Sequence, residues 1–98
     1  MIVIAKLKAK SGKEDDLKKA VLDALPNVAQ EEGTLVYAFN RSLTDPTEFI
    51  FYEKYTDGDA LKAHSSTEHF KKMFAALTPC LDGAPEIGMY EEIGIVKK

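Results

Sequence analysis

The stretch Phe49-Ile50-Phe51-Tyr52-Glu53-Lys54-Tyr55 alternates aromatic, β-branched and charged side chains along its length. Such alternation is typical of a β-strand, because successive side chains of a strand point to opposite faces of a sheet. A turn at Asp57-Gly58 follows, and the next residues are predicted to be helical. His64 and His69 lie in that region and are the 2 histidines of the chain. We therefore expect any active site to lie where this strand meets the segment up to Phe74.

The same reasoning places the other elements along the chain. Strands are predicted at 2–9, 34–42, 49–55 and roughly 86–95, with a helix after Ser11 and helical pieces at roughly 58–64 and 66–78. The turn Thr44-Asp45-Pro46-Thr47 should join the second and third strands into an antiparallel hairpin.

The first helix carries start and stop signals. Ser11-Gly12-Lys13-Glu14 has the spacing of a capping box, in which the Ser11 side chain accepts from the Glu14 backbone N–H. Apolar residues then recur every three or four positions as far as Val28, which indicates one buried stripe. Pro26 falls inside this pattern, so a kink or a break is expected there. Gly33 fits the C-terminus of the helix.

The order β-α-β-β-α-β predicts a ferredoxin-like α+β fold, with an antiparallel four-stranded sheet and both helices on one face. The strands predicted at 34–42 and 49–55 carry apolar side chains on both of their faces. A sheet that is apolar on both faces needs two covers, and the helices supply only one. We therefore expect a homodimer in which the sheet of a second copy covers the other face.

Length and composition bound the possible functions. The 98 residues suffice for a single domain, 1–98. A net charge of -3 without a basic stripe argues against nucleic acid as a partner. Cys80 is the only cysteine, so no internal disulfide is possible. No long apolar run is present, which predicts no signal peptide, no membrane span and a cytoplasmic location.

The acidic and metal-binding residue types give weak signals. His64 and His69 are five residues apart across a predicted helix junction, with no cysteine nearby, and this spacing predicts no metal site. The acidic runs Glu14-Asp15-Asp16 and Glu31-Glu32 are interpreted as solvated faces. Phe70, Met73, Phe74 and Leu77 form a helical stripe that is more typical of a core than of a pocket lining.

Two residues could carry acid–base chemistry. His64 shares a helix face with Leu61 and Ala60. It is either a core histidine satisfied by a backbone carbonyl or a general base facing a pocket, since imidazole titrates near neutral pH. Glu53 falls on the same strand face as Phe51, and a carboxylate among aromatic residues is either a paired structural charge or a group tuned for proton transfer.

These patterns together resemble a known family. The motifs are Phe49-x-x-Tyr52-Glu53-x-Tyr55, Ala60-Leu61-x-Ala63-His64 and Thr67-x-His69-Phe70, with Ser11-Gly12-Lys13, Glu32-Gly33-Thr34-Leu35 and Asp45-Pro46 in the expected order. Over nearly the whole chain they resemble the antibiotic biosynthesis monooxygenase (ABM) domain family, and most of all its small quinol-monooxygenase-like and autoinducer-processing members.

The resemblance implies a dimeric α+β barrel with a pocket between sheet and helices. Typical members oxidise electron-rich aromatics with O₂ and need no metal, flavin or haem. One branch degrades haem with an Asn, a Trp and a His, where this chain has Ala5, His64 and Phe74 and no tryptophan at all. Haem degradation is therefore not expected, because no axial histidine is in place. The same match suggests that these three residues line the pocket.

The leading hypothesis is a cofactor-independent monooxygenase that acts on a quinol or another hydroxylated aromatic. His64 would remove a phenolic proton, and Glu53 would orient His64 or the substrate. Residues implied in substrate binding are Ala5, Tyr37, Phe39, Tyr52, His69, Phe70, Met73 and Phe74. The alternatives are an isomerase of a small phosphorylated hydroxy-ketone, which would need Arg41 or a lysine near the pocket, and a non-catalytic dimer that binds a small ligand.

Overall fold

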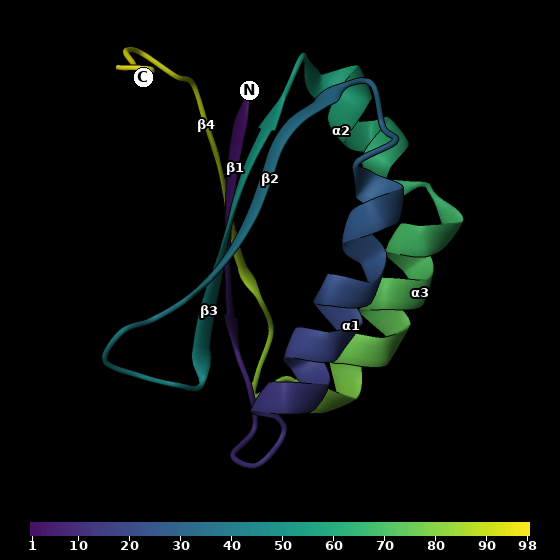
Figure 1. Cartoon of the computed structure of the whole chain (residues 1–98), viewed down its shortest axis with the longest axis vertical. Coiled ribbons are helices and arrows are strands. Elements are labelled where there is room, and N and C mark those ends of the chain that lie inside the picture. Colours follow the sequence, from purple (N-terminus) through teal and green to yellow (C-terminus); the bar gives the residue numbers. More distant parts are fainter.

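The computed structural model describes residues 1–98 as one sheet covered by helices (Figure 1). The elements in chain order are β1 (Ile2–Lys8), α1 (Glu14–Val28), β2 (Thr34–Arg41), β3 (Glu48–Tyr55), α2 (Gly58–Ser65), α3 (Glu68–Leu77), the 3₁₀ turn η1 (Thr78–Cys80) and β4 (Glu86–Tyr90). None of the helices combines the length and apolarity that a membrane crossing requires.

The sheet is antiparallel, with strand order β2-β3-β1-β4. The helices all lie on one of its faces, and the other face is open (Figure 1). This arrangement confirms the ferredoxin-like α+β fold predicted from the sequence. The register sets Phe51 opposite Ala5 and Ala5 opposite Ile87, so three strands present neighbouring side chains to the helices.

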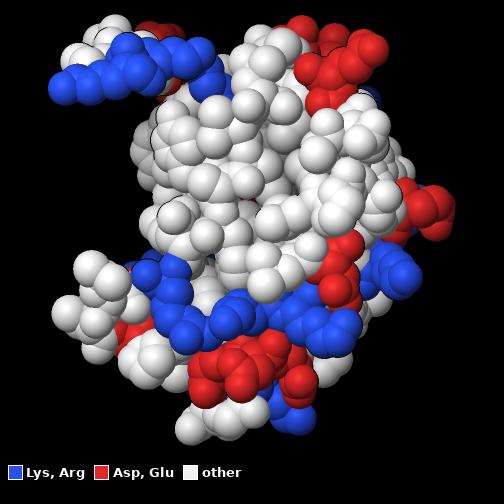
Figure 2. Space-filling model, viewed as in Figure 1, with Lys and Arg blue, Asp and Glu red and all other residues white.

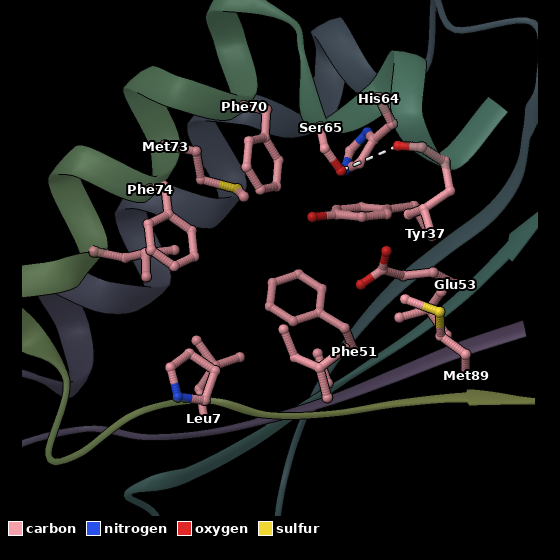
Figure 3. A pocket seen from close by; sticks show the side chains of 16 residues that line it. Leu7, Tyr37, Phe51, Glu53, His64, Ser65, Phe70, Met73, Phe74 and Met89 are labelled. Atoms are coloured by element: carbon pink, nitrogen blue, oxygen red, sulfur yellow. Dashed lines mark hydrogen bonds between the residues drawn. The ribbon is translucent and has the colours of Figure 1, made fainter. Parts of the chain in front are cut away.

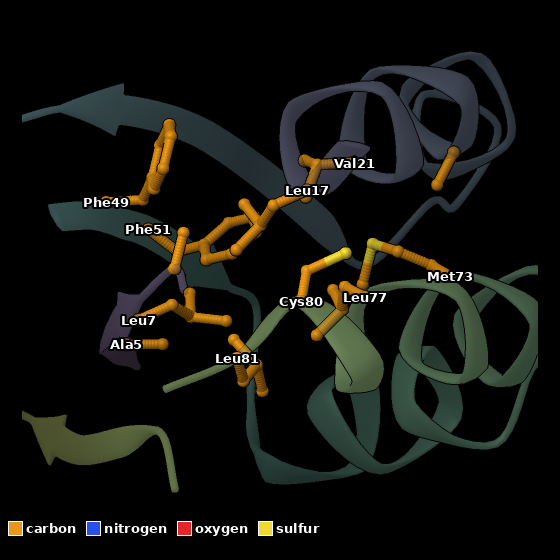
Figure 4. Packing of buried hydrophobic residues seen from close by; sticks show 12 residues of the cluster. Ala5, Leu7, Leu17, Val21, Phe49, Phe51, Met73, Leu77, Cys80 and Leu81 are labelled. Atoms are coloured by element: carbon orange, nitrogen blue, oxygen red, sulfur yellow. The ribbon is translucent and has the colours of Figure 1, made fainter. Parts of the chain in front are cut away.

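The hydrophobic core lies between the sheet and the helices (Figure 4). Alternate residues of the central strands are buried, as the sequence pattern predicts; they are Val3, Ala5 and Leu7 on β1 and Phe49, Phe51 and Tyr55 on β3. Leu17 and Val21 from α1 and Leu77 from α3 pack against them. Burying one such side chain contributes about 1.5–3 kcal/mol, so these contacts fix how the helices sit on the sheet.

Helix α1 starts differently from the prediction and continues past Pro26. It begins at Glu14 without a side-chain cap, and the Glu14 carboxylate instead accepts a bond of 2.6 Å from the Gly12 backbone N–H. The predicted capping box with Ser11 is therefore wrong. Pro26 neither breaks nor ends the helix, which continues to Val28. Pro26 lies on the exposed side of α1, where the carbonyl four residues earlier, that of Leu22, can bond to water.

Gly33 does not end α1, because the helix stops at Val28 and a turn follows. The glycine is needed for a close approach instead. A Cβ at this position would lie 2.5 Å from the Cβ of Ala60 in α2. The turn between α1 and β2 therefore packs directly onto α2, which places Glu31 beside that helix.

The last strand is shorter than predicted. β4 ends at Tyr90, which pairs with Ile2 at the very start of β1, so no partner strand extends further. Residues 91–98 leave the sheet (Figure 1), and the side chains of Ile93, Ile95 and Val96 are exposed there.

Candidate functional site

A cavity of about 190 Å³ lies between the helix-covered face of the sheet and helices α2 and α3 (Figure 3). Its 16 lining residues are mostly apolar and come from all four strands, from α2 and α3, and from the loop before β4; they are Val3, Ala5, Leu7, Tyr37, Phe51, Glu53, Leu61, His64, Ser65, Phe70, Met73, Phe74, Leu77, Pro85, Ile87 and Met89. No lysine or arginine is among them. On the face seen in Figure 2, a band of charged side chains crosses the lower part, and the area above it is largely uncharged.

Most of the residues predicted from the sequence meet in this cavity. Those that line it are Ala5, Tyr37, Glu53, His64, Phe70, Met73 and Phe74. Phe39, Tyr52 and His69 do not. The Phe39 ring packs on the rings of Phe49 and Phe51, at centroid distances of 5.2 and 4.9 Å. Tyr52 lies on the open face of the sheet, because its neighbours in β3 face the helices.

Several lining residues were not predicted, although the strand alternation could have identified some of them. Val3 and Leu7 share the face of Ala5, and Phe51 shares that of Glu53. Ile87 and Met89 enter the cavity because β4 pairs with β1, setting Ile87 opposite Ala5. That pairing depends on the sheet order, which hydrophobic periodicity alone does not give.

The junction between α2 and α3 positions both histidines. The Asp57 side chain caps α2 by accepting from the Ala60 N–H. Thr67 caps α3 by accepting from the Phe70 N–H, and its hydroxyl donates to the His64 carbonyl at 2.9 Å. The chain bends here, so His64 at the end of α2 and His69 in the first turn of α3 can both reach Glu31.

Glu31 is the residue that the sequence interpretation misplaced. It was expected on a solvated face, but its carboxylate accepts hydrogen bonds from the Thr34 hydroxyl at 2.7 Å, from His64 Nδ1 at 2.7 Å and from His69 Nε2. Burial alone would raise the pKa of this carboxyl. The bonds from Thr34 and the two histidines outweigh burial, so the pKa of Glu31 lies below its ordinary value.

The charge of Glu31 determines which ring nitrogen of His64 carries hydrogen. An ionised carboxylate is an acceptor only, so the ring nitrogen facing it must carry hydrogen. A neutral His64 ring is thereby protonated at Nδ1 and keeps a lone pair at Nε2. That Nε2 atom is buried without any hydrogen-bond partner. A buried polar group left unpaired costs about 1–3 kcal/mol, a cost that a hydroxyl in the cavity would remove.

Aromatic rings surround the His64 imidazole. The rings of Tyr37, Phe70 and Tyr55 lie 5.1, 5.3 and 5.6 Å from it, centroid to centroid. Figure 3 shows His64 beside Tyr37 at the α2 end of the cavity. Burial, together with the negative charges of Glu53 and Glu31, raises the pKa of the Tyr37 hydroxyl well above its ordinary value. Tyr37 therefore remains a neutral hydroxyl that can donate a hydrogen bond.

Glu53 was predicted to orient either His64 or the substrate, and it makes no hydrogen bond to His64. The Tyr55 hydroxyl donates to its carboxyl at 2.5 Å, whereas the carboxylate bonded to His64 is that of Glu31. Orienting His64 is thus assigned to Glu31. Burial raises the pKa of Glu53 above its ordinary value, although the Tyr55 hydroxyl and the His64 ring act in the opposite direction.

Glu31, His64 and His69 are also the residue types that bind metal ions, and their ligand atoms lie within 4.8 Å of one another. The Glu31–His64 contact of 2.7 Å is a direct hydrogen bond. A zinc ion about 2.0–2.2 Å from each ligand atom would have to separate these groups and replace both histidine bonds. The arrangement favours a hydrogen-bonded cluster, and the absence of a metal requirement stays a prediction.

Glu53→Gln should change how stability depends on pH. Because the pKa of Glu53 is raised in the folded state, the folded protein binds this proton more tightly than the unfolded chain does. The parent should lose free energy of unfolding as pH rises from the ordinary glutamate pKa through the raised one, by up to about 1.4 kcal/mol per pH unit. The substituted amide cannot ionise. Denaturant unfolding at several pH values should therefore show that the free energy of unfolding of the variant rises relative to that of the parent as pH increases.

Tyr55→Phe is the matched comparison. It removes the hydroxyl that lowers the pKa of Glu53, so the loss of stability with rising pH should become larger than in the parent. If the free energies of unfolding of the parent and Glu53→Gln depend on pH in the same way, the pKa of Glu53 is not raised by burial.

Comparison with known proteins agrees with the fold. The family model described as antibiotic biosynthesis monooxygenase matches residues 1–76. A Caulobacter crescentus protein assigned to the same class is 37% identical, with a TM-score of 0.89 over 95% of this chain and 89% of that chain. A conserved Methanosarcina mazei protein is 28% identical, with a TM-score of 0.88 over 93% and 90% of the two chains.

A Nitrosomonas europaea protein with the same assignment has a TM-score of 0.91 over 95% of this chain and 98% of that chain. Its identity is 22%, so this likeness shows the fold alone. The family model and the similarity to the Caulobacter crescentus protein show that this chain belongs to the antibiotic biosynthesis monooxygenase family.

Proposed function

We propose that the protein is a cofactor-independent monooxygenase that oxidises a quinol or another small hydroxylated aromatic with O₂. The observation that carries this proposal is that His64, which lines an aromatic cavity, has a buried Nε2 without a hydrogen-bond partner. A phenolic hydroxyl is the group that would satisfy this atom while its ring packs against Phe51 and Phe70. Membership of the monooxygenase family supports the same reaction class.

The first step is proton transfer from the substrate hydroxyl to Nε2. An isolated phenolate would be unfavourable here, because the cavity raises the pKa of the Tyr37 phenol. The proton therefore stays next to the anion, on an imidazolium whose Nδ1–H faces the Glu31 carboxylate. A carboxylate in this position stabilises the imidazolium and holds its orientation. The Tyr37 hydroxyl can donate to the phenolate oxygen.

The second step uses the reducing power of the anion. The phenolate gives one electron to O₂, and the two radicals combine at a ring carbon that bears hydrogen. The resulting peroxide takes back the proton held on His64 and becomes a hydroperoxide. Loss of the hydrogen on that ring carbon as a proton and cleavage of the O–O bond leave one oxygen on the ring as a carbonyl. The other oxygen leaves as hydroxide, which combines with a proton to give water, so a quinol and O₂ yield a hydroxyquinone and water. Glu53 lines the same cavity, and we propose that its carboxylate carries the ring-carbon proton to the departing oxygen.

The size and charge of the cavity support a small, uncharged substrate. Its volume of about 190 Å³ is below the range of about 300–1,000 Å³ that is typical of pockets for drug-sized ligands. A phosphorylated hydroxy-ketone would require a cation, and the lining has none. Arg41, which was considered for that role, lies 5.0 Å from the centroid of the Phe49 ring and outside this cavity. The isomerase alternative therefore has no observation in its favour.

We also propose that the active form is a homodimer. Ile50 and Val36 are exposed on the open face of the sheet, where Tyr52 also lies, and residues 91–98 extend from the sheet with exposed apolar side chains. A second copy would cover both surfaces, and such an interface should bury more than about 1,200 Å².

His64→Asn should lower the turnover of a quinol substrate by roughly 10²–10⁴-fold, the usual contribution of a general base. The Asn amide can still donate toward Glu31, but no basic nitrogen remains at the Nε2 position. Oxygen uptake with a panel of quinols, without added cofactor or metal, measures the rate. Ser66→Ala is the control, because Ser66 lies outside the cavity and its hydroxyl bonds to the Lys62 carbonyl.

The general-base role would be disproved by a His64→Asn protein that is folded and oxidises quinols at the parent rate. A parent that consumes no oxygen with any quinol, but binds one, would leave the ligand-binding alternative in place.

Ile50→Lys should convert the dimer to a monomer, because a charge on the open sheet face cannot be buried between two copies. Sedimentation at micromolar concentration should give the mass of two chains for the parent and one for the variant. Leu43→Lys, in the exposed β2–β3 turn, should remain dimeric. A parent that sediments as a single chain contradicts the proposal.

A further inference from the structure

His69 lies outside the cavity but is connected to it through Glu31. Its side chain is 21% exposed, and its Nε2 contacts Glu31 Oε2. The same residue borders a second cavity, of about 110 Å³, between α1 and α3. Glu31 therefore lies between a histidine that faces the main cavity and one that faces the far side of the helix layer.

The two oxygens of Glu31 are held by different donors. Oε1 accepts from the Thr34 hydroxyl and from His64 Nδ1, each at 2.7 Å. Oε2 accepts only from His69. Thr34 and His64 anchor one oxygen, which leaves the carboxylate free to rotate about that anchor. The His69 bond removes this freedom and fixes the plane of the carboxylate against the His64 ring.

We propose that His69 is a positioning residue for the base His64 and acts through Glu31 without touching the substrate. This inference rests on the proposed function. The Glu31 carboxylate, held at both oxygens, keeps His64 in the tautomer with hydrogen on Nδ1 and a lone pair on Nε2. When Oε2 loses its donor, the carboxylate turns toward water, and part of the His64 population takes the other tautomer, which cannot accept a proton at Nε2.

The experiment compares His69→Gln with His69→Leu. The Gln amide nitrogen can occupy the place of His69 Nε2 and donate to Glu31, whereas Leu fills similar space and donates nothing. The tautomer of His64 in the ligand-free protein is read from long-range ¹H–¹⁵N NMR correlations of its ring. Turnover of a quinol, resolved into kcat and KM, is the second measurement.

We expect His69→Leu to show mixed His64 tautomers and to lose about 10–100-fold in kcat, the range known for residues that orient metal-bound histidines. KM should stay close to that of the parent, because His69 does not contact the cavity. His69→Gln should restore the Nδ1–H tautomer and most of the rate. A purely structural role would instead lower the melting temperature of both variants and leave the His64 tautomer unchanged.

Three results would overturn the inference. They are an unchanged His64 tautomer in His69→Leu, a Gln variant as impaired as the Leu variant, and a shift of the parent's histidine ring signals on treatment with a chelator, which would indicate a bound metal. His69→Phe serves as the second variant without a donor if His69→Leu does not fold. The tautomer is measured without substrate. A parent that is inactive with every quinol would therefore disprove the proposed function, and the NMR measurement would still test whether His69 positions His64.

Discussion

The site depends on one interaction, the hydrogen bond of 2.7 Å from His64 Nδ1 to the Glu31 carboxylate. It joins the turn after α1 to the end of α2, and the close packing of Gly33 on Ala60 brings these two segments together. The same bond leaves the second ring nitrogen of His64, a residue that lines the apolar cavity, buried without a partner. One contact therefore ties the packing of the helix layer to the chemistry that the cavity can perform.

The cavity disfavours an isolated phenolate but favours a phenolate paired with the His64 imidazolium. Burial and two carboxylates make a free phenolate unfavourable, as the raised pKa of Tyr37 shows. Proton transfer to His64 avoids this penalty, because the charge formed is an adjacent ion pair whose cation faces Glu31. The aromatic walls exclude water and so strengthen that pair. A site of this kind suits a substrate that arrives neutral and becomes electron-rich only after it has bound.

The sequence allowed the sheet and its buried face to be predicted, because the alternation in β1 and β3 depends only on local periodicity. It did not allow Glu31 to be identified. This residue lies 33 positions from His64 in the chain, and its place depends on how the α1–β2 turn packs against α2. The adjacent acid in Glu31-Glu32 favoured a solvated interpretation. The convergence of His64 and His69 likewise depends on the bend at Thr67, since one continuous helix would point residues five apart in different directions.

The central claim is that His64 Nε2 removes the proton of a bound phenol. Its most direct test is the absorption spectrum of para-nitrophenol bound to the protein, at a pH where the free compound is neutral. The account predicts that the phenolate band appears on binding to the parent and is absent with the His64→Asn protein. A compound that binds the parent with the spectrum of the neutral phenol would contradict the account.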